Sequence, residues 1–297
     1  MARLRGAPLA APRSCTHWRE HYDEGRNGAI SVELSPAQFR KIARIVHQLA
    51  GIALHDGKEE LVKARLMKRL RELNINSVKE YIKYLENDAS GRELAELIDI
   101  MTTNKTCFFR EYEHFKFLKE RVLPEWKHGE KRIWSAGCSS GEEPYSIAIL
   151  LREELRTSAR VKILATDISA RMLKKAKEGI YPAEELKNVP PDVVRKYFTP
   201  VPHETTSLFR IKDEVKCMVR FARLNLMDRW PMKGPFDIIF CRNVMIYFDR
   251  ETKEQLLQRF WKMLAPGGYL FIGHSESLAP LSSPFLYVKP AIYRKAT

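Results

Sequence analysis

Residues 137–144 form the segment whose residue types most clearly suggest chemistry. They read Gly-Cys-Ser-Ser-Gly-Glu-Glu-Pro and follow an apolar run that ends at Ala136. Glycines at such a point permit a sharp turn and let a ligand approach backbone N–H groups, as in nucleotide-binding folds. The pair Glu142-Glu143 would repel a pyrophosphate, and neither the dinucleotide glycine pattern nor the phosphate-binding loop pattern is present. The loop therefore favours a ligand with cationic groups and no phosphate, such as S-adenosylmethionine. A glycine turn before an acidic helix start, which stabilises the helix dipole, is the alternative.

Two further segments end in polar residues that could face the same ligand. Asp167 follows the apolar residues 163–165, and an acidic side chain at the end of a second strand can accept hydrogen bonds from both ribose hydroxyls. Before Ser169, it could equally cap a helix. Asn243 and Tyr247 follow the apolar run 236–241. Ligands of open α/β sheets bind beyond the carboxyl ends of the strands, so we expect both residues near the reacting centre.

The elements that must position these residues alternate between strands and helices from residue 131 onward. This alternation predicts an α/β fold of the Rossmann-like kind. A proline-punctuated section, about residues 181–222, is expected to be an inserted antiparallel β-subdomain in which runs 207–211 and 215–221 form a hairpin. The expected strands are 132–136, 161–166, 236–241, 269–273, 285–288 and 292–294, and the expected helices are 111–122, 143–156, 170–178 and 252–264.

Apolar residues recur at three- and four-residue steps in the part of the chain before residue 103. This spacing predicts four helices, at residues 35–50, 58–73, 77–85 and 91–101, and hence an all-α domain over residues 31–103. Residues 104–297 are assigned to the α/β domain. Residues 1–30 lack such a pattern and are expected to be a disordered extension.

Composition and charge narrow the class of protein. The 297 residues include five scattered cysteines with no Cys-x-x-Cys pair, so the cysteines suggest neither a disulfide framework nor a zinc site, and we expect no metal. No apolar run is long enough for a membrane span, and no secretion signal is present, so a cytoplasmic location is expected.

The formal net charge of +14 favours an anionic partner. Five basic residues fall within the expected helix 58–73, where a solvated helix face is an equally good explanation: Lys63, Arg65, Lys68, Arg69 and Arg71.

The assembled motifs resemble the CheR family of bacterial chemotaxis, the methyltransferases that act on chemoreceptor glutamates. The resemblance spans roughly residues 31–295 and rests on four motifs. They are Thr103-Asn-Lys-Thr-Cys-Phe-Phe-Arg110-Glu111, Ala136-Gly-Cys-Ser-Ser-Gly-Glu-Glu-Pro-Tyr-Ser146, Ala165-Thr-Asp-Ile-Ser169 and Cys241-Arg-Asn-Val-Met-Ile-Tyr-Phe248. It implies a helical domain joined to a Rossmann-like methyltransferase domain with an inserted β-subdomain. It also implies methyl transfer from S-adenosylmethionine to glutamate side chains of methyl-accepting chemoreceptors, giving γ-glutamyl methyl esters and S-adenosylhomocysteine.

The resemblance also assigns roles residue by residue. Arg110 would orient the acceptor glutamate, and Tyr247 would help to position it. Glu142 would face the cationic end of the cofactor and Asp167 its ribose. The five basic residues of helix 58–73 would face the cytoplasmic helical region of the receptor, at the receptor arrays. The full set of expected cofactor contacts is Asn104, Thr106, Arg110, Glu142, Asp167, Asn225, Leu226, Arg242 and Asn243.

One departure from the family pattern concerns receptor docking. Family members that dock a pentapeptide at the receptor's C-terminus have a glycine-containing loop in the β-subdomain, whereas residues 202–215 contain no glycine. We therefore expect an enzyme that does not depend on such a pentapeptide.

Two other functions compete with this interpretation. A nucleic-acid methyltransferase would suit the positive charge, but no Asn/Asp-Pro-Pro-Tyr/Phe segment follows the expected strand 236–241, so nucleic acid is not the expected partner. A non-catalytic receptor adaptor is disfavoured because five candidate site residues are present together: Arg110, Glu142, Asp167, Asn243 and Tyr247.

Overall fold

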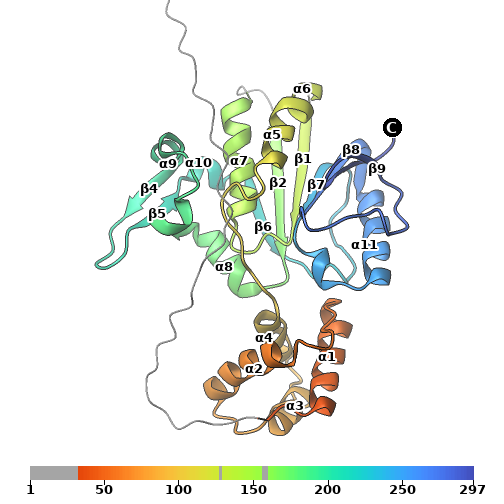
Figure 1. Ribbon diagram of the computed structural model, residues 1–297. Helices are drawn as coiled ribbons and strands as arrows, with labels where there is room; N and C mark the ends of the chain where they lie inside the picture. Colours follow the sequence, from red (N-terminus) through yellow and green to blue (C-terminus); the bar gives the residue numbers. More distant parts are fainter. Residues whose placement is uncertain (1–32, 127–128, 156–159) are drawn as a thin grey trace, which may run out of the picture.

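The chain is seen here in a computed structural model that describes residues 33–126, 129–155 and 160–297 (Figure 1). The expected disordered extension, residues 1–30, lies outside the described residues. Within the described residues, no helix is both long and apolar enough to cross a membrane.

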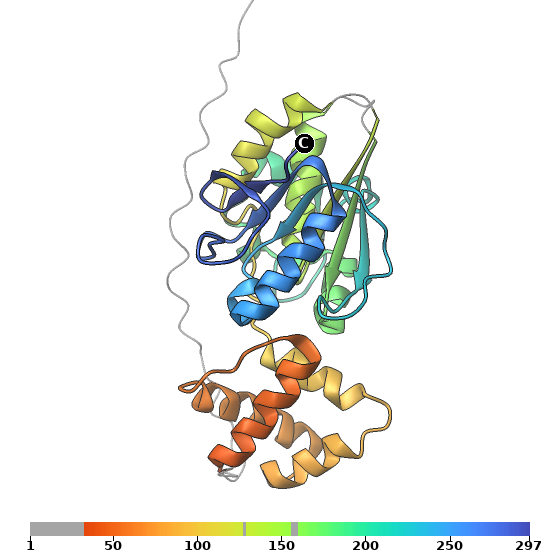
Figure 2. The same ribbon diagram turned by 90° about the vertical axis from the view of Figure 1, so that its right-hand side faces the viewer.

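The helical part comprises α1 (Pro36–Ala50), α2 (Glu59–Leu73), α3 (Val78–Glu86) and α4 (Arg92–Met101). Helix α1 begins with a capping box, in which Ser35 and Gln38 satisfy each other's backbone N–H groups, and it ends at Gly51 with φ 71°. The apolar stripes predicted from the sequence, which include Ile42, Leu66 and Leu97, are fully buried. Figure 2 shows the four helices gathered as a separate layer below the α/β domain.

The α/β part is built on a seven-stranded sheet of order β6-β2-β1-β7-β8-β10-β9. Strands β6, β2, β1, β7 and β8 are parallel, and β10 pairs antiparallel with both β8 and β9. Their bounds are β1 (Glu130–Ala136), β2 (Arg160–Asp167), β6 (Val219–Arg223), β7 (Phe236–Cys241), β8 (Leu264–Ile272), β9 (Leu286–Lys289) and β10 (Ile292–Arg294). The fold class predicted from the sequence is therefore correct.

Helices cover both faces of this sheet, because successive strand side chains point to opposite faces. Ile239 and Cys241 of β7 pack in the same apolar cluster as α11 (Arg250–Met263), whereas Ile238 and Phe240 pack with α7 (Glu142–Glu154) and α5 (Glu113–Phe117). Helix α8 (Ala170–Glu178) lies against β2 and β6. After α5 the chain continues through a π-helical turn, η1 (Leu118–Val122), into α6 (Leu123–Glu125), so the expected helix 111–122 begins later and runs past Pro124.

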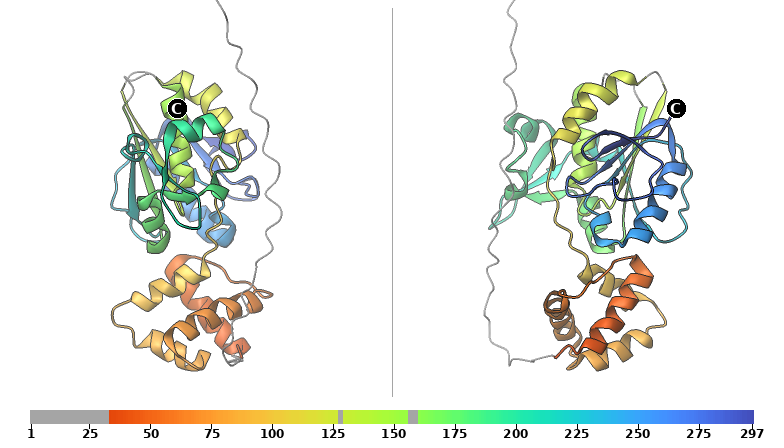
Figure 3. Two further views of the ribbon diagram at one scale, coloured as in Figure 1. Left: turned by 90° about the vertical axis from the view of Figure 1, so that its left-hand side faces the viewer. Right: turned by 45° about the vertical axis from the view of Figure 1, so that its right-hand side comes forward.

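A second, three-stranded antiparallel sheet projects from the side of the α/β domain (Figure 3). Its order is β3-β5-β4, with β3 (Ile180–Pro182), β4 (Phe198–Val201) and β5 (Leu208–Ile211). The segments that connect and flank these strands contain the short helices η2 (Ala183–Leu186), α9 (Pro191–Tyr197) and α10 (Asp213–Lys216).

The hairpin expected between residues 207–211 and 215–221 is wrong. Residues 213–216 form α10, and β6 joins the large sheet parallel to β2, with Val219 opposite Ile163. An alternating apolar pattern indicates a strand but not its partner, and here Phe221 packs against Tyr145 of α7 rather than in the small sheet.

Candidate active site

A pocket lies where the carboxyl ends of β1, β2 and β7 face the helical part of the chain. The pocket and the solvent space at its open mouth together measure about 900 Å³. Ala50, the last residue of α1, and Ile52, just after that helix, line one side. The other lining residues are Thr102, Thr103, Asn104, Lys105, Thr106, Arg110, Gly137, Ser139, Glu143, Asp167, Ile168, Leu224, Asn225, Leu226, Arg242, Asn243, Val244, Tyr247 and Phe248.

The loop after β1 is shaped by residues with positive φ. Gly137 has φ 86°, and a Cβ built there would lie 2.4 Å from Cγ2 of Val244, so the loop passes directly against the segment that follows β7. Ser139, at φ 47°, points its backbone N–H at Asp167. The loop thus turns its backbone toward the pocket, as the glycine pattern predicts.

Asp167 lies at the end of β2 and lines the pocket while being 7% exposed. Its two carboxylate oxygens accept hydrogen bonds from the backbone N–H groups of Ser139 (2.7 Å) and Ser169 (2.9 Å), and its burial raises its pKa. Ser169, whose hydroxyl accepts from Met172, is the residue that caps α8. The capping role considered for Asp167 is therefore taken by another residue, and the carboxylate stays at the pocket wall.

Arg242 is the charged centre of the wall formed by β7. Its side chain is 2% exposed and makes ion pairs with Glu111 and Glu143, each at 3.1 Å, and it also donates to the carbonyl of Arg110. Burial acts to raise the pKa of Glu111, but the charge of Arg242 and the amide of Asn243 outweigh it and leave that pKa lowered. Burial dominates at Glu143 and raises its pKa. Arg242 thereby fixes two carboxylates beside the pocket.

The segment 102–106 links the two parts of the chain and forms one wall of the pocket. Arg110 and Tyr247, which are predicted to orient the acceptor glutamate, each donate a hydrogen bond to this segment. Arg110 lines the pocket and donates to the carbonyl of Lys105 at 2.8 Å. Tyr247 also lines it, and its hydroxyl donates to the carbonyl of Thr103 at 3.4 Å. Asn104 and Thr106 lie on the same wall.

Asn225 and Leu226 line the pocket from the segment after β6. The amide of Asn225 donates to the carbonyl of Leu49 at 2.6 Å, and its oxygen accepts from the backbone N–H of Met227. Asn225 therefore also ties the α/β part to the end of α1. Asn243, at φ 58°, completes the set and donates through its amide to Glu111 at 3.2 Å.

Of the nine expected cofactor contacts, the structure places eight on the pocket and leaves Glu142 outside its lining. Glu142 is 2% exposed and accepts from the hydroxyl of Ser140, and burial raises its pKa to about 7. Its neighbour Glu143 lines the pocket instead. Consecutive residues at a helix start point in directions about 100° apart, and here Glu143 is the one that lines the pocket. The cofactor contact of Glu142 stays a prediction.

The five basic residues of α2 do not form one uniform surface. Lys68 and Arg71 are exposed, and Lys63 is partly exposed. Arg65 donates to the carbonyl of Met101 (2.6 Å) and to the hydroxyl of Thr103 (2.7 Å), so it holds α2 against the linking segment. Charge also does not distinguish the helical part as a whole, because residues 33–103 contain 12 basic and 11 acidic residues.

Arg69 has a structural partner of its own. Two nitrogens of its guanidinium donate to the carboxylate of Glu93 of α4, at 2.9 and 2.5 Å, and Glu93 is 4% exposed. Tyr81 of α3 donates to the same carboxylate at 2.8 Å. Arg69 therefore joins three helices, and its positive charge is directed at Glu93 rather than at a partner protein.

The pocket lining also includes residues that were not predicted from the sequence, among them Ala50, Ile52, Lys105 and Glu143. Ala50 and Ile52 belong to the helical part, and no sequence signal connects them to the pocket. Glu143 has the same sequence signal as Glu142, since the two are consecutive acidic residues at the start of an expected helix.

Family models match both parts of the chain. Residues 104–293 match the model described as "CheR methyltransferase, SAM binding domain", and residues 37–102 match "CheR methyltransferase, all-alpha domain". The chain belongs to the CheR methyltransferase family. The resemblance stated from the motifs is thereby confirmed, and so are S-adenosylmethionine as the cofactor and methyltransferase as the class of enzyme.

Curated relatives extend over almost the whole CheR chain. The chemotaxis protein methyltransferase of Escherichia coli is 44% identical over 264 residues, covering 88% of this chain and 91% of the relative. That of Borreliella burgdorferi is 41% identical over 277 residues, covering 90% and 96%. Among solved structures, the plantazolicin methyltransferase BpumL in complex with S-adenosylhomocysteine aligns with TM-score 0.35 and 16% identity over 65% of this chain and 60% of its own. The present chain is an S-adenosylmethionine-dependent chemotaxis methyltransferase.

Proposed function

We propose that this enzyme methylates glutamate side chains of chemoreceptors, forming γ-glutamyl methyl esters. The observation that carries the proposal is the position of Arg110 on the wall of the cofactor pocket, beside Tyr247 and the linking segment. A guanidinium at that place suits a carboxylate acceptor, since its planar fork can bind both carboxylate oxygens.

The residues of the pocket fit S-adenosylmethionine. Asp167 retains lone pairs for ribose hydroxyls, Gly137 and Ser139 present backbone close to the ligand, and Glu143 supplies negative charge toward a cationic end. When bound, S-adenosylmethionine supplies an electrophilic methyl group on a sulfonium.

The chain's own residues then have little proton chemistry to perform. A glutamate is ionised at neutral pH, because its unperturbed pKa is about 4.3, so the acceptor oxygen is already nucleophilic and no general base is needed. Arg110 would orient that carboxylate in line with the methyl group, and Tyr247 would restrict its approach. Rate enhancement would come mainly from orientation and from exclusion of water by the surrounding walls.

We propose that the exposed residues Lys68 and Arg71 of α2, with the partly exposed Lys63, face the cytoplasmic helices of the receptor, where the glutamates to be methylated lie. Positive charge there would steer the encounter with an acidic helix surface. Arg65 and Arg69 are left out of this surface because their charges are engaged within the domain.

The test incubates the protein with methyl-tritiated S-adenosylmethionine and membranes that contain candidate receptors. The labelled receptor band is then treated with base, and volatile methanol is counted. We expect base-labile counts on the receptor. Arg110→Lys should reduce them at least about 10-fold, since a point charge replaces the bidentate fork. The matched control is Arg121→Lys, in the π-helical turn η1 outside the pocket lining.

Two outcomes would contradict the proposal. Base-stable label would show that the acceptor is not a carboxylate. Full activity of the Arg110→Lys variant at limiting receptor would show that Arg110 does not orient the acceptor.

A further inference from the structure

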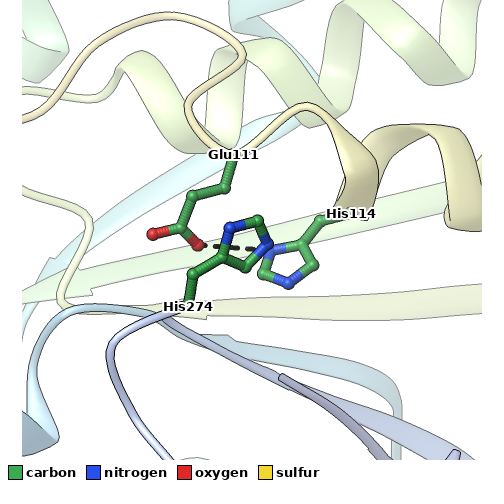
Figure 4. A group of neighbouring side chains, drawn as sticks. All are labelled: Glu111, His114 and His274. Carbon is green, nitrogen blue, oxygen red and sulfur yellow. Dashed lines mark ion pairs between the residues drawn. The ribbon is translucent and has the colours of Figure 1, made fainter. Parts of the chain in front are cut away.

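Behind the wall of the cofactor pocket, three side chains from two segments converge: Glu111 and His114 at the start of α5, and His274 after β8 (Figure 4). Glu111 stands before α5 with φ 56°, His114 lies within α5, and His274 follows β8. One ligand atom of each lies within 4.8 Å of those of the other two. The group is separate from the residues assigned to cofactor and acceptor, although Glu111 contacts Arg242.

His114 is the member that ordinary packing does not explain. Its side chain is 1% exposed, and among the described residues neither ring nitrogen has a hydrogen-bond partner. A buried polar group left in this state costs about 1–3 kcal/mol. Its Nδ1 lies 3.6 Å from Oε2 of Glu111, beyond hydrogen-bond distance (Figure 4).

Glu111 is held by other groups in the way that ligating carboxylates are. Arg242 binds Oε2 at 3.1 Å, and the amide of Asn243 donates to Oε1 at 3.2 Å. Such partners fix the direction of a ligating carboxylate and tune a metal site. They also connect this group to the cofactor pocket, which both residues line.

We propose that Glu111, His114 and His274 form a binding site for a divalent transition metal of the zinc class. Two imidazoles and one carboxylate are a ligand set that zinc accepts with a water in the fourth position. Zinc bonds of about 2.0–2.1 Å require ligand atoms roughly 3.3 Å apart, so the side chains must close in on the metal. His274 is exposed, so the room for that movement lies on its side of the group.

The surroundings indicate an exchangeable site rather than a structural one. The guanidinium of Arg242 lies 3.1 Å from Oε2 of Glu111, and positive charge near a cation weakens its binding. His274 at the surface gives the metal a route from solvent. The metal would occupy this site without being needed for folding.

The test measures metal binding to the full-length chain by competition with a chromogenic chelator, using zinc, and by the visible absorption of bound cobalt(II). The host chain carries Cys15→Ser, His17→Ala and His21→Ala, because these residues could bind metal on their own. We expect the host to bind one zinc ion. His274→Ala should weaken that binding at least about 100-fold, beyond the 10–100-fold expected for a residue that only supports a ligand.

His55→Ala is the matched control, since His55 is also exposed and lies outside the cluster. It should leave the affinity unchanged. Equal zinc affinity in the host and in His274→Ala would overturn the proposal. A second variant, Glu111→Gln, removes the anionic ligand without burying new polar volume. If it binds zinc as tightly as the host does, the site is likewise refuted.

Discussion

Replacing Arg69 tests whether this arginine builds the helical domain or serves a partner. Its guanidinium is 17% exposed and its partner Glu93 is 4% exposed, so the pair is largely withdrawn from water. Removing one member of such a pair typically costs about 3–5 kcal/mol, because the other charge stays buried without compensation. Since Arg69 keeps some exposure, we expect Arg69→Met to cost about 3 kcal/mol.

The assay is hydrogen exchange of the full-length chain, followed on peptides from α2 and α4. A loss of about 3 kcal/mol raises the exchange of amides that open with the domain by roughly 100-fold, at about 1.4 kcal/mol for each factor of ten. Lys68→Met, on the same helix but exposed, should change stability by no more than about 0.5 kcal/mol.

A third variant isolates the cause. Adding Glu93→Gln to Arg69→Met removes the stranded charge and keeps an acceptor for the hydroxyl of Tyr81. The double variant should therefore be more stable than Arg69→Met alone, although it carries one change more. If it is equally stable or less stable, or if Arg69→Met exchanges like Lys68→Met, the reasoning about the buried pair is refuted.

Further predictions concern the pocket and its neighbour Glu142. Gly137→Ala should weaken S-adenosylhomocysteine binding at least about 10-fold by calorimetry, because its Cβ would collide with Val244, whereas Gly57→Ala, also at positive φ but facing open space, should not. For Glu142, whose pKa burial raises to about 7, the folded protein keeps a proton that the unfolded chain loses above its lower pKa, so stability falls as pH rises from about 5 to 7. Glu142→Gln should remove this dependence, so that the variant gains roughly 2–3 kcal/mol relative to wild type between pH 5 and pH 8 in urea unfolding, and a constant difference would contradict it. Charge reversal at Lys68 and Arg71 should slow receptor methylation at low salt without changing cofactor affinity, and an unchanged rate would remove α2 from the receptor surface.

The sequence predicts the fold well because its periodic signals are strong. Ser35 and Gln38 define the start of α1, and the apolar runs that form β1, β2 and β7 alternate with amphipathic helices. It fails at β6, where five residues have an ordinary strand pattern and the choice between two sheets depends on contacts far along the chain, such as Phe221 with Tyr145. Local pattern carries no information on that choice.

The motifs predict where along the chain the site lies, but not every side chain that faces it. Motif positions identify most pocket residues, but they do not show that Glu143, and not Glu142, lines the pocket, since the direction of the first helical turn decides this. The motifs also do not show that the charge of Arg69 is already paired within the domain, because its partner Glu93 lies 24 residues away. Counting charges along a helix overestimates the charge available to a partner.

The contacts between the two parts of the chain bring the helical domain to the wall of the cofactor pocket. The backbone N–H of Ala53 donates to the carbonyl of Tyr247 at 2.7 Å, Ile52 pairs with Phe248, and Asn225 holds the end of α1. The pocket is therefore closed by residues that belong to the helical domain. In the receptor complex that we propose, this docking would fix how far α2, the receptor-facing helix, lies from Arg110. A receptor helix bound on α2 could then present only those glutamates that this fixed separation allows.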